Sequence, residues 1–522
     1  MRIAAIDIGS NSVHMIAADA RAAGGLDLID KAKDFVRLGD GVFETGLLRE
    51  DRVEAAVQAI DGYARIARSI GAERVVTVAT SATRDADNGE DFVRRLRDRT
   101  GVDARVISGE EEARLIYLAV LQKIDLHGKR TLVVDVGGGS VELSLGTGEQ
   151  IAMAESLDLG VRRLRDTVGA PGKLDGETIE RVRRHVERTA DSIVDRVHEH
   201  GVDLLVGTSG TLKTLGELTV HPDAGWKTIN SESTSLDDLE AITKRLVKQT
   251  PDERVEKCGV ERRRADTIHL GALLITTLMK RLGVDAITFS DASLREGVIQ
   301  AHLRASEAAA GRALTGSLQR RSVFELGRRY GADGPRARHV RTLALELFDR
   351  TRDLHQLDED DRRFLEYASE LHRVGHFVSY RRNHKHARYL IRHARMPGFT
   401  NDEVRFLALL VRYHRKSKPK KKHKRYKKLS KSRRRAIRVL AGLLRVAIAL
   451  DRKGGQTVTS ALVEVHDDRV EIYASGESVL DEVRAARSER ALLERSLDRE
   501  VVVQSGVDEA SSMPHLSSPR SS

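Results

Sequence analysis

The sequence predicts two α/β domains, followed by an all-α domain and a small α/β domain. Three patterns support this: apolar strands alternate with amphipathic helices up to residue 304, helical spacing dominates residues 322–411, and strand-like segments return after residue 460. The chain has 522 residues, which suits three or four domains of ~100–200 residues each. We expect domains at 1–124, 125–304, 305–440 and 441–505, and a disordered, serine-rich tail at 506–522.

The first domain begins with a strand–helix–strand pattern. Residues 3–6 form a short apolar strand that ends in Asp-x-Gly, and residues 75–78 form another strand. Between them, residues 51–69 carry apolar side chains at helical spacing. Further on, Ser108 or Gly109 is placed to cap a helix whose first turn holds three glutamates, which the helix dipole favours.

The alternation restarts near residue 130 and then gives way to helices. It predicts, in chain order, the strand 132–136, the helix 179–198, the strand 204–206, the helix 268–282 and the strand 286–290. Residues 306–318 are rich in small residues and predict a linker or a first short helix. After the helical region, a helix at 436–450 leads into two strands, 462–465 and 469–473, which form a hairpin turning at Asp467-Asp468.

The composition excludes several classes of protein. With 40% hydrophobic and 32% charged residues, the chain is neither disordered nor a membrane protein by composition. A single cysteine, Cys258, excludes a disulfide framework and a thiolate zinc site. The longest uncharged stretch near the middle, 267–279, is far below the ~20 residues of a spanning helix. Because no apolar signal region follows Met1, we expect a cytoplasmic protein without a membrane span.

The net charge of +11 comes from one segment. Residues 415–435 hold 14 Lys or Arg and no acid, so the rest of the chain carries a net charge of −3. Such a run is usually a solvated or disordered loop, and it is also able to bind a polyanion. It contains one aromatic residue, Tyr426, so nucleic acid is not expected as a partner. The candidate polyanion-binding residues are Lys418, Lys420, Lys421, Lys422, Lys424, Arg425, Lys427 and Lys428.

The most informative feature is an internal repeat of two loops. Ile6-Asp7-Ile8-Gly9-Ser10-Asn11-Ser12-Val13 aligns with Val134-Asp135-Val136-Gly137-Gly138-Gly139-Ser140-Val141. In both copies an Asp ends a strand, where its carboxylate is able to hold a metal ion or a metal-bound water. The glycine two residues later lets the backbone approach an anion, and the small residues that follow offer N–H and hydroxyl donors to phosphate oxygens. Two ordinary hairpin turns are the alternative interpretation.

Two further segments fit a phosphate site between the α/β domains. Gly207-Thr208-Ser209-Gly210-Thr211 is a third Gly/Ser/Thr loop after a strand. The acidic helix start holds Glu110, Glu111 and Glu112; the first two are expected only to complement the helix dipole. A third acid that enters the cleft is a candidate general base.

These residues resemble the exopolyphosphatase / guanosine pentaphosphate phosphohydrolase (Ppx/GppA) family. The matching segments are the two repeated loops, residues 79–84 (Ala-Thr-Ser-Ala-Thr-Arg), 107–115, 207–211, 291–297 and, as in the longer members, 410–416. The resemblance implies an actin-like (RNase H-like) ATPase-superfamily domain pair, followed by an HD-like helical domain, and a hydrolase that cleaves a terminal phosphoanhydride. It implies Mg²⁺ as the cofactor, with K⁺ left open as a further cation, and we expect a homodimer.

The resemblance also implies roles for individual residues. Glu112 would be the general base, and Asp135 and Glu142 would bind or orient Mg²⁺ and the attacking water. Arg84 would hold the terminal phosphate. The phosphate-binding residues would be Asp7, Gly9, Ser10, Asn11 and Ser12 of the first loop, Gly137, Gly138, Gly139 and Ser140 of the second, and Gly207, Thr208, Ser209 and Gly210 of the third. Phosphoryl transfer depends on positioning and charge neutralisation, which such a set provides.

Two positions depart from the family pattern. The second loop reads Ser140-Val141-Glu142 where Ser-Thr-Glu is usual, so one hydroxyl is missing. In the HD-like domain, Arg373 follows His372 where a metal-binding Asp would stand. We therefore expect no second metal centre there, and we interpret the histidines of this region as structural or as polyanion contacts.

Three functions remain open from the sequence. The first is an exopolyphosphatase acting on inorganic polyphosphate, which the basic run slightly favours. The second is a guanosine pentaphosphate 5′-phosphohydrolase, whose motifs are the same. The third is a non-enzymatic sensor that binds nucleotide or nucleic acid, against which the intact Glu112, Asp135 and Glu142 count, because a pure binder needs no base.

Overall fold

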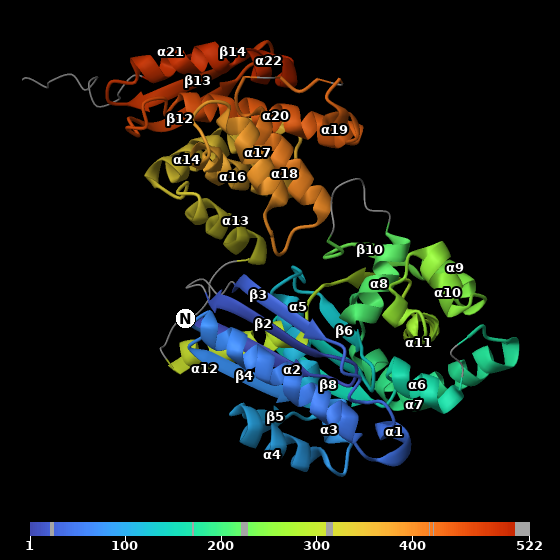
Figure 1. The fold of residues 1–522 in the computed structure, drawn as a ribbon. Helices are drawn as coiled ribbons and strands as arrows, with labels where there is room; N and C mark the ends of the chain where they lie inside the picture. The colour runs from blue at the N-terminus through green and yellow to red at the C-terminus, as the bar shows by residue number, and fades with distance from the viewer. Residues whose placement is uncertain are drawn as a thin grey trace, which may run out of the picture. The chain divides into compact units, whose positions relative to one another are not determined.

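The computed structural model describes residues 1–20, 26–169, 172–220, 228–309, 317–416, 418–420 and 422–506 (Figure 1). The chain forms two compact units. The first comprises residues 1–318 and 397–401, and the second comprises residues 319–396 and 402–522. Each unit is described by itself. The predicted disordered tail lies outside the described residues, apart from Gly506.

The first unit opens with a five-stranded sheet of order β3-β2-β1-β4-β5. The strands β1 (Arg2–Ile8), β2 (Val13–Ala20) and β3 (Leu26–Asp34) are antiparallel neighbours. The strands β4 (Arg74–Ala79) and β5 (Ala104–Val106) continue the sheet parallel to β1. The predicted strands 3–6 and 75–78 are confirmed, whereas β3 was not predicted.

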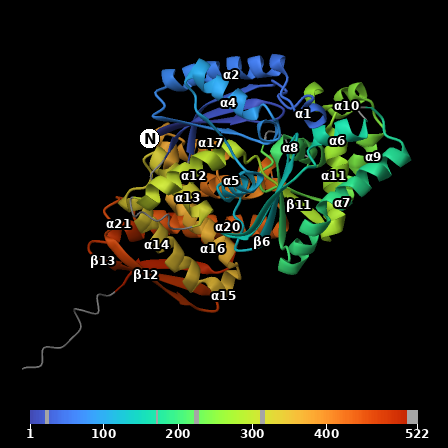
Figure 2. The same cartoon turned by 90° about the horizontal axis from the view of Figure 1, so that it is seen from below.

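Helices cover both faces of this sheet. On one face lie α2 (Glu50–Ser69) and α4 (Gly89–Thr100), which Figure 2 shows together on the same side of the strands. On the other face lie α5 (Gly109–Leu121) and α12 (Leu294–Ala309). The chain thus returns to the first sheet with α12, after it has built the second one. Two short helices, α1 (Val42–Thr45) and α3 (Ser81–Arg84), follow β3 and β4.

Alternation along β1 explains how one strand supplies two cores. Ala4 and Ile6 pack in the core beneath α2 and α4, whereas Ile3 and Ala5 pack in the core beneath α5 and α12. Successive side chains of a strand point to opposite faces, so an entirely apolar segment of this length fits a strand buried on both sides.

The second sheet repeats this design in the order β10-β11-β9-β6-β7-β8. The strands β6, β7 and β8 form an antiparallel meander and β9 runs parallel to β6, as β4 does to β1. The bounds are β6 (Arg130–Val136), β7 (Val141–Thr147), β8 (Gln150–Leu157), β9 (Leu204–Thr208), β10 (Ser233–Ser235) and β11 (Ala286–Phe289). Two sheets of this design are the actin-like arrangement that the resemblance implied.

The helices around the second sheet follow the predicted spacing. They are α6 (Val161–Val168), α7 (Gly176–His200), α8 (Ser209–Thr219), α9 (Leu236–Val247), α10 (Pro251–Cys258), the 3₁₀-helix η1 (Arg262–Arg264) and α11 (Ile268–Leu282). The central helix is α11, because all of its residues except Lys280 and Arg281 are buried. Its unbroken apolar sequence therefore reflects burial in a domain core.

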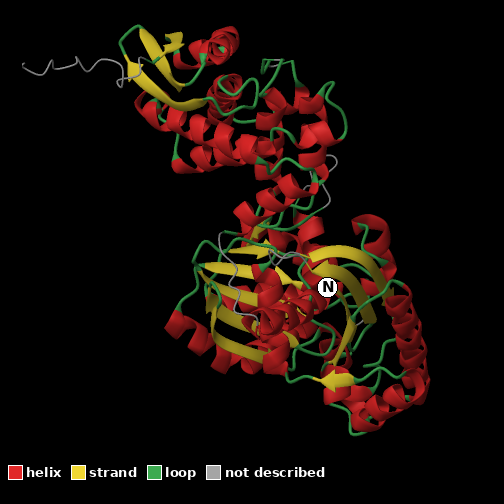
Figure 3. Ribbon diagram, turned by 90° about the vertical axis from the view of Figure 1, so that its left-hand side faces the viewer, coloured by secondary structure: helices red, strands yellow, loops and turns green. Residues whose placement is uncertain are grey.

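The second unit combines helices with a three-stranded sheet, seen as yellow arrows in Figure 3. The helices are α13 (Leu318–Arg329), α14 (Pro335–Arg350), α15 (Arg352–His355), α16 (Glu359–Leu371), η2 (Val374–Phe377), α17 (Asn383–His393), α18 (Asn401–Tyr413), α19 (Lys424–Lys427), α20 (Lys431–Ala449), α21 (Leu480–Glu489) and α22 (Ala491–Leu497). The strands are β12 (Val458–Val465), β13 (Arg469–Gly476) and β14 (Glu500–Ser505), in this order across the sheet.

The predicted hairpin at 462–473 is confirmed as the antiparallel pair β12–β13. Strand β12 packs on α14, and α20 packs on both α14 and the helices α21 and α22. The predicted boundary at residue 440 falls inside α20, where Val439, Leu440 and Ala441 are fully buried. A single helix therefore serves the helical part and the sheet part of this unit.

The basic run is more ordered than a solvated loop. Residues 424–427 form the helical turn α19, and α20 begins at Lys431, five residues earlier than predicted. Tyr426 is 2% exposed; its hydroxyl donates to the carbonyl of Arg434 at 3.0 Å, and its ring lies 5.9 Å from that of Tyr413. The expectation of a solvated loop is thus wrong for 424–435, because a buried tyrosine anchors the segment. Lys421 lies outside the described residues.

No helix in the described ranges is long and apolar enough to cross a membrane.

Candidate active site

The two repeated loops adopt the same turn. The N–H of Gly9 donates to the carbonyl of Ser12 at 3.2 Å, and the N–H of Gly137 donates to the carbonyl of Ser140 at 3.0 Å. In each case the strands on either side of the turn pair antiparallel, β1 with β2 and β6 with β7. The repeat is therefore a duplicated strand–turn–strand unit.

The loops approach one another within the first unit. A Cβ atom at Gly138 would lie 3.7 Å from the Cβ atoms of Ser10 and Asn11. A Cβ atom at Gly139 would lie only 2.4 Å from the hydroxyl of Ser81, the residue that begins α3. A side chain at position 139 would therefore displace the side chain of Ser81, and glycine lets these segments approach closely.

The third loop joins the second loop through the sheet. Thr208 is the register partner of Asp135 on the neighbouring strand, and its hydroxyl donates to the carbonyl of Ala292 at 2.6 Å. Ser209 begins α8 with a φ of 99°, and its Oγ accepts hydrogen bonds from the N–H groups of Thr211 and Leu212 at 3.2 and 3.3 Å. A Cβ atom at Gly210 would lie 2.0 Å from the guanidinium of Arg264, so glycine lets this arginine lie on the loop.

Four carboxylates gather where these loops meet. Asp7 and Asp135 lie near the ends of β1 and β6, Glu142 is the register partner of Asp135 on β7, and Glu112 lies in the first turn of α5. Burial raises the pKa of Glu112, and the negative charges of Glu142 and Asp7 raise it further. Burial likewise raises the pKa of Asp135 well above its usual value, with Glu142 and Asp7 as further causes. All four groups therefore share one electrostatic environment.

Glu112 is paired with Arg84. The Nη1 atom of Arg84 lies 3.3 Å from Oε2 of Glu112 and donates to the carbonyl of Ile107 at 2.9 Å. The guanidinium partly offsets the rise in the pKa of Glu112. Ser108 caps α5 by accepting from the N–H of Glu111, as the sequence predicted, and this fixes the first turn that carries Glu112. The other two glutamates of that turn point elsewhere, since Glu110 pairs with Arg114 and Glu111 with Arg105.

Glu142 is held by serine hydroxyls. Its Oε1 accepts from the hydroxyl of Ser156, its register partner on β8, at 2.8 Å. Burial raises the pKa of Glu142, whereas hydrogen bonds from Ser140 and Ser156 act in the opposite direction. Sequence reasoning missed Ser156, because its position depends on pairing with a strand that was not predicted.

Several cations near the loops were also missed. Arg295 of α12 and Lys33 of β3 lower the pKa of Asp7, although burial is the largest influence and the pKa is raised to about 6. Arg162 of α6 forms an ion pair with Asp40 and donates to Oδ1 of Asn11 at 2.6 Å. Arg295 belongs to the 291–297 segment that carried the family resemblance, so a signal for it was present.

His14 occupies the position opposite Asp7 that Glu142 occupies opposite Asp135. Its Nε2 atom lies 2.6 Å from the hydroxyl of Ser12 in the first loop. Burial lowers the pKa of His14 to about 2, and Arg295, Lys33, Arg264 and Arg263 lower it further in that order of influence. The ring is therefore neutral at physiological pH.

An open cavity of about 560 Å³ lies beside these residues. Arg84, Gly109 and Ser156 are part of its lining, together with Asp85 and Glu110. The cavity is thus lined by Arg84 and Ser156, the partners of Glu112 and Glu142, while these two carboxylates are buried behind them.

The carboxylate cluster fits a divalent cation. Within the described ranges the carboxylates of Asp7 and Asp135 make no hydrogen bond or ion pair; the like charges of Glu142 and Asp7 act on Asp135, whereas the cations Arg295 and Lys33 act on Asp7. Mg²⁺ is typically held by one or two carboxylates together with phosphate oxygens and water. Binding of Mg²⁺ at this cluster therefore does not require three protein ligands close together. In the described part of the chain, three such ligands lie close together only at Glu464, His466 and Glu471, in the second unit.

The predicted polyanion-binding residues belong to the second unit. Of those that the structure describes, Lys420, Lys422, Lys424, Lys427 and Lys428 are exposed, whereas Lys418 and Arg425 are partly buried. Three histidines of this unit are buried together: the ring of His414 is 5.8 Å from that of His372 and 6.3 Å from that of His384, whereas His393 is exposed. Burial lowers the pKa of all three rings, so they are neutral.

Comparison with known proteins decides the family. A sequence profile of the Ppx/GppA phosphatase family matches residues 16–305, and a profile of domain III of the Ppx/GppA phosphatases matches residues 318–501. The chain belongs to the Ppx/GppA phosphatase family. This confirms the resemblance that the repeated loops indicated and makes the chain a phosphatase-type hydrolase by family.

Solved structures of Ppx/GppA proteins align with the α/β part of the chain. The Ppx/GppA family member from Aquifex aeolicus is 31% identical and has a TM-score of 0.52, with 59% of this chain and 98% of that chain covered. An exopolyphosphatase from Cytophaga hutchinsonii is 28% identical and has a TM-score of 0.55, with 58% and 98% covered. An exopolyphosphatase-like protein is 25% identical with a TM-score of 0.53, covering 59% and 98%.

Proposed function

We propose that this Ppx/GppA protein is an exopolyphosphatase that releases orthophosphate from the end of inorganic polyphosphate. The observation that carries the proposal is the placement of Glu112. It is an acid of raised pKa, paired with Arg84 beside an open cavity and close to three glycine-rich loops. A base next to a cation and phosphate-binding loops suits attack of water on a terminal phosphate.

The residues divide into phosphate binders and proton acceptors. The N–H and hydroxyl groups of the three loops would bind the phosphates nearest the cut, and Arg84 would bind the terminal one. Asp135 and Glu142 would hold Mg²⁺, with K⁺ as a further candidate cation; the metal, when bound, neutralises charge on the phosphate oxygens. Ser156 keeps the carboxylate of Glu142 in place.

Glu112 would accept the proton of the attacking water. The oxygen of that water attacks the terminal phosphorus, the bond between this phosphorus and its bridging oxygen breaks, and the shortened chain leaves in line. Arg84 lies against Glu112 in this structure. A terminal phosphate that draws Arg84 away would remove a cation from Glu112, and this raises the basicity of the carboxylate at the moment when the substrate is bound.

Hydrolysis of guanosine pentaphosphate to the tetraphosphate is the second candidate function, because the chemistry at the cut is the same. One observation favours the polymer. The second unit exposes the side chains of Lys420, Lys422, Lys424, Lys427 and Lys428, which suit a long polyanion better than a nucleotide. A purely binding, non-enzymatic role is the least favoured, because four carboxylates oppose the binding of a polyanion unless a metal is present.

The test is phosphate release from long-chain polyphosphate and from guanosine pentaphosphate, measured in parallel with Mg²⁺. Glu112→Gln is expected to reduce the rate ~10²–10⁴-fold and leave polyphosphate binding nearly unchanged, because a general base contributes to the transition state and not to ground-state binding. Glu111→Gln, on the same helical turn, is the matched control and should keep the wild-type rate, because Glu111 pairs with Arg105 and does not line the cavity. Release from guanosine pentaphosphate alone would overturn the polymer assignment, and release from neither would overturn both. The expectations of a homodimer and a cytoplasmic location stay predictions.

A further inference from the structure

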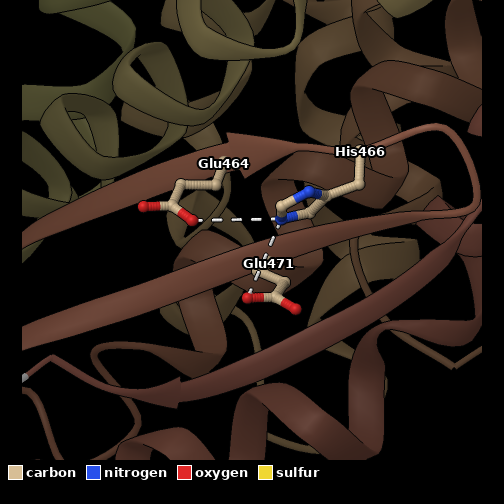
Figure 4. A group of neighbouring side chains, drawn as sticks. All are labelled: Glu464, His466 and Glu471. Carbon is tan, nitrogen blue, oxygen red and sulfur yellow. Dashed lines mark ion pairs between the residues drawn. The ribbon is translucent and has the colours of Figure 1, made fainter.

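A group of possible metal ligands lies on the β12–β13 hairpin of the second unit, far along the chain from the phosphate loops. Figure 4 shows Glu464 on β12, Glu471 on β13 and His466 in the turn between them. One ligand atom from each residue lies within 4.8 Å of the others, which holds for no other three His, Cys, Asp or Glu residues in the described ranges.

The hairpin fixes the positions of these three residues. Glu464 and Glu471 are register partners on adjacent strands, so their side chains stand on the same face of the sheet. The N–H of His466 donates to the carbonyl of Arg469 at 2.9 Å and closes the turn. The group is therefore held by backbone pairing and not by a flexible loop.

The distances within the group suit a bridging ion. The Nε2 atom of His466 lies 3.9 Å from Oε2 of Glu464 and 3.9 Å from Oε2 of Glu471, the two dashed lines of Figure 4. This is too long for a hydrogen bond, and the buried Nε2 atom has no hydrogen-bond partner in the described structure. Ligand atoms ~2.1 Å from a common zinc ion lie ~3.4 Å apart at a tetrahedral angle and ~4.2 Å apart when opposite. The observed 3.9 Å falls inside this interval.

The surroundings favour a cation. Asp467 and Asp468 add two negative charges in the turn, and Arg469 is the cation that pairs with Asp468 and with Glu471. Arg469 donates to Oε1 of Glu471 and the hydroxyl of Tyr473 donates to Oε2, both at 2.5 Å. These bonds keep the carboxylate oriented, as outer partners of metal ligands commonly do.

We propose that Glu464, His466 and Glu471 bind one divalent transition-metal ion of the zinc class. An imidazole with two carboxylates suits Zn²⁺ better than Mg²⁺, which prefers oxygen ligands alone. The ion would join both strands and the turn of the hairpin at the edge of the sheet. This role is separate from the phosphate chemistry of the first unit and does not depend on the proposed function.

The experiment measures metal binding by the full-length, metal-free protein. Zn²⁺ is titrated by calorimetry, and Co²⁺ is titrated by visible absorption as an independent probe. His466→Ala and Glu464→Gln are expected to lose one bound equivalent, or to bind it at least tenfold more weakly. The matched control is His127→Ala, which removes an exposed histidine that lies 3.6 Å from a single carboxylate, that of Asp125, and it should bind as the wild type does.

Thermal unfolding completes the test. Without metal, His466→Ala and the wild type should unfold at the same temperature, because His466 makes no side-chain hydrogen bond in the described structure. With Zn²⁺, the unfolding temperature of the wild type should rise and that of His466→Ala should stay unchanged. Equal stoichiometry and affinity in His466→Ala and the wild type would overturn the proposal, as would an equal loss in His127→Ala.

Discussion

Asp7 should destabilise the metal-free fold at neutral pH, and removing its charge should stabilise the first unit. Burial raises the pKa of Asp7 from 3.8 to about 6, because the charged form loses hydration at the end of β1. The folded state then holds the proton more tightly than the unfolded chain. Stability from this group is fully present below pH 3.8 and is lost as the pH rises through about 6.

The magnitude follows from the pKa. Each pKa unit is worth ~1.4 kcal/mol, so raising the pKa from 3.8 to about 6 destabilises the folded state by up to ~3 kcal/mol at pH 8. Because Asp7 is partly exposed to water, screening reduces this value towards ~1–2 kcal/mol. Asp7→Asn keeps the shape of the side chain without its charge. The free energy of unfolding of Asp7→Asn should therefore be ~1–2 kcal/mol higher than that of the wild type at pH 8, and similar to it near pH 4.

The assay is unfolding of the full-length protein by denaturant at several pH values, with a metal chelator present. The unfolding transition of the first unit is the one that is measured. Asp19→Asn is the matched control, since Asp19 lies on the adjacent strand β2 and a hydrogen bond from Arg2 lowers its pKa. That variant should be slightly less stable, by under ~1 kcal/mol, as expected of an exposed ion pair. The reasoning would be refuted if Asp7→Asn and the wild type had the same free energy of unfolding at pH 8, or if the difference between them did not change with pH. Adding Mg²⁺ should reduce the difference in stability between Asp7→Asn and the wild type. The cation stabilises the charged carboxylate of Asp7, and the variant has no charge at this position.

Three further changes test the proposed site. Asp135→Asn should raise the Mg²⁺ concentration needed for half-maximal phosphate release and lower the rate, because it removes a charged oxygen ligand; an unchanged Mg²⁺ titration would leave Asp135 as a turn residue only. Ser156→Ala removes a hydrogen bond that lowers the pKa of Glu142, so the acidic limb of the pH–rate profile should move to higher pH, and an unmoved limb would contradict the positioning role. Neutralising the cations of residues 418–428 should weaken cleavage of long chains at low salt more than cleavage of tripolyphosphate; equal effects on both across a salt series would identify the segment as a tolerant surface.

The local parts of the site could be predicted from the sequence. Each phosphate loop is a strand, a tight turn and a second strand within a dozen residues, so residue types and spacing suffice to recognise it. The cap at Ser108 and the orientation of the first turn of α5 are equally local. These features were confirmed because they depend on the backbone of neighbouring residues and not on long-range pairing.

The parts that could not be predicted depend on long-range contacts. The strands β3 and β8 lie at sheet edges; β3 is interrupted by charged residues, and the apolar run of β8 is only four residues long, 151–154. Missing β8 also meant missing Ser156, which reaches Glu142 only through strand pairing. Arg295 lies 160 positions after Asp135, and the sequence around Arg295 does not indicate that α12 packs on the first sheet.

The duplicated loops share a backbone but differ in charge. Opposite Asp135 stands an acid, Glu142, and further acids raise the pKa of Asp135. Opposite Asp7 stands a neutral histidine, His14, surrounded by Arg295, Lys33, Arg264 and Arg263. The surroundings of Asp135 therefore favour a cation and those of Asp7 favour an anion, although both loops have the same strand–turn–strand backbone. Under the proposed function, a phosphoanhydride bound between the loops would meet carboxylates that suit a metal ion on one side and cations that suit phosphate oxygens on the other.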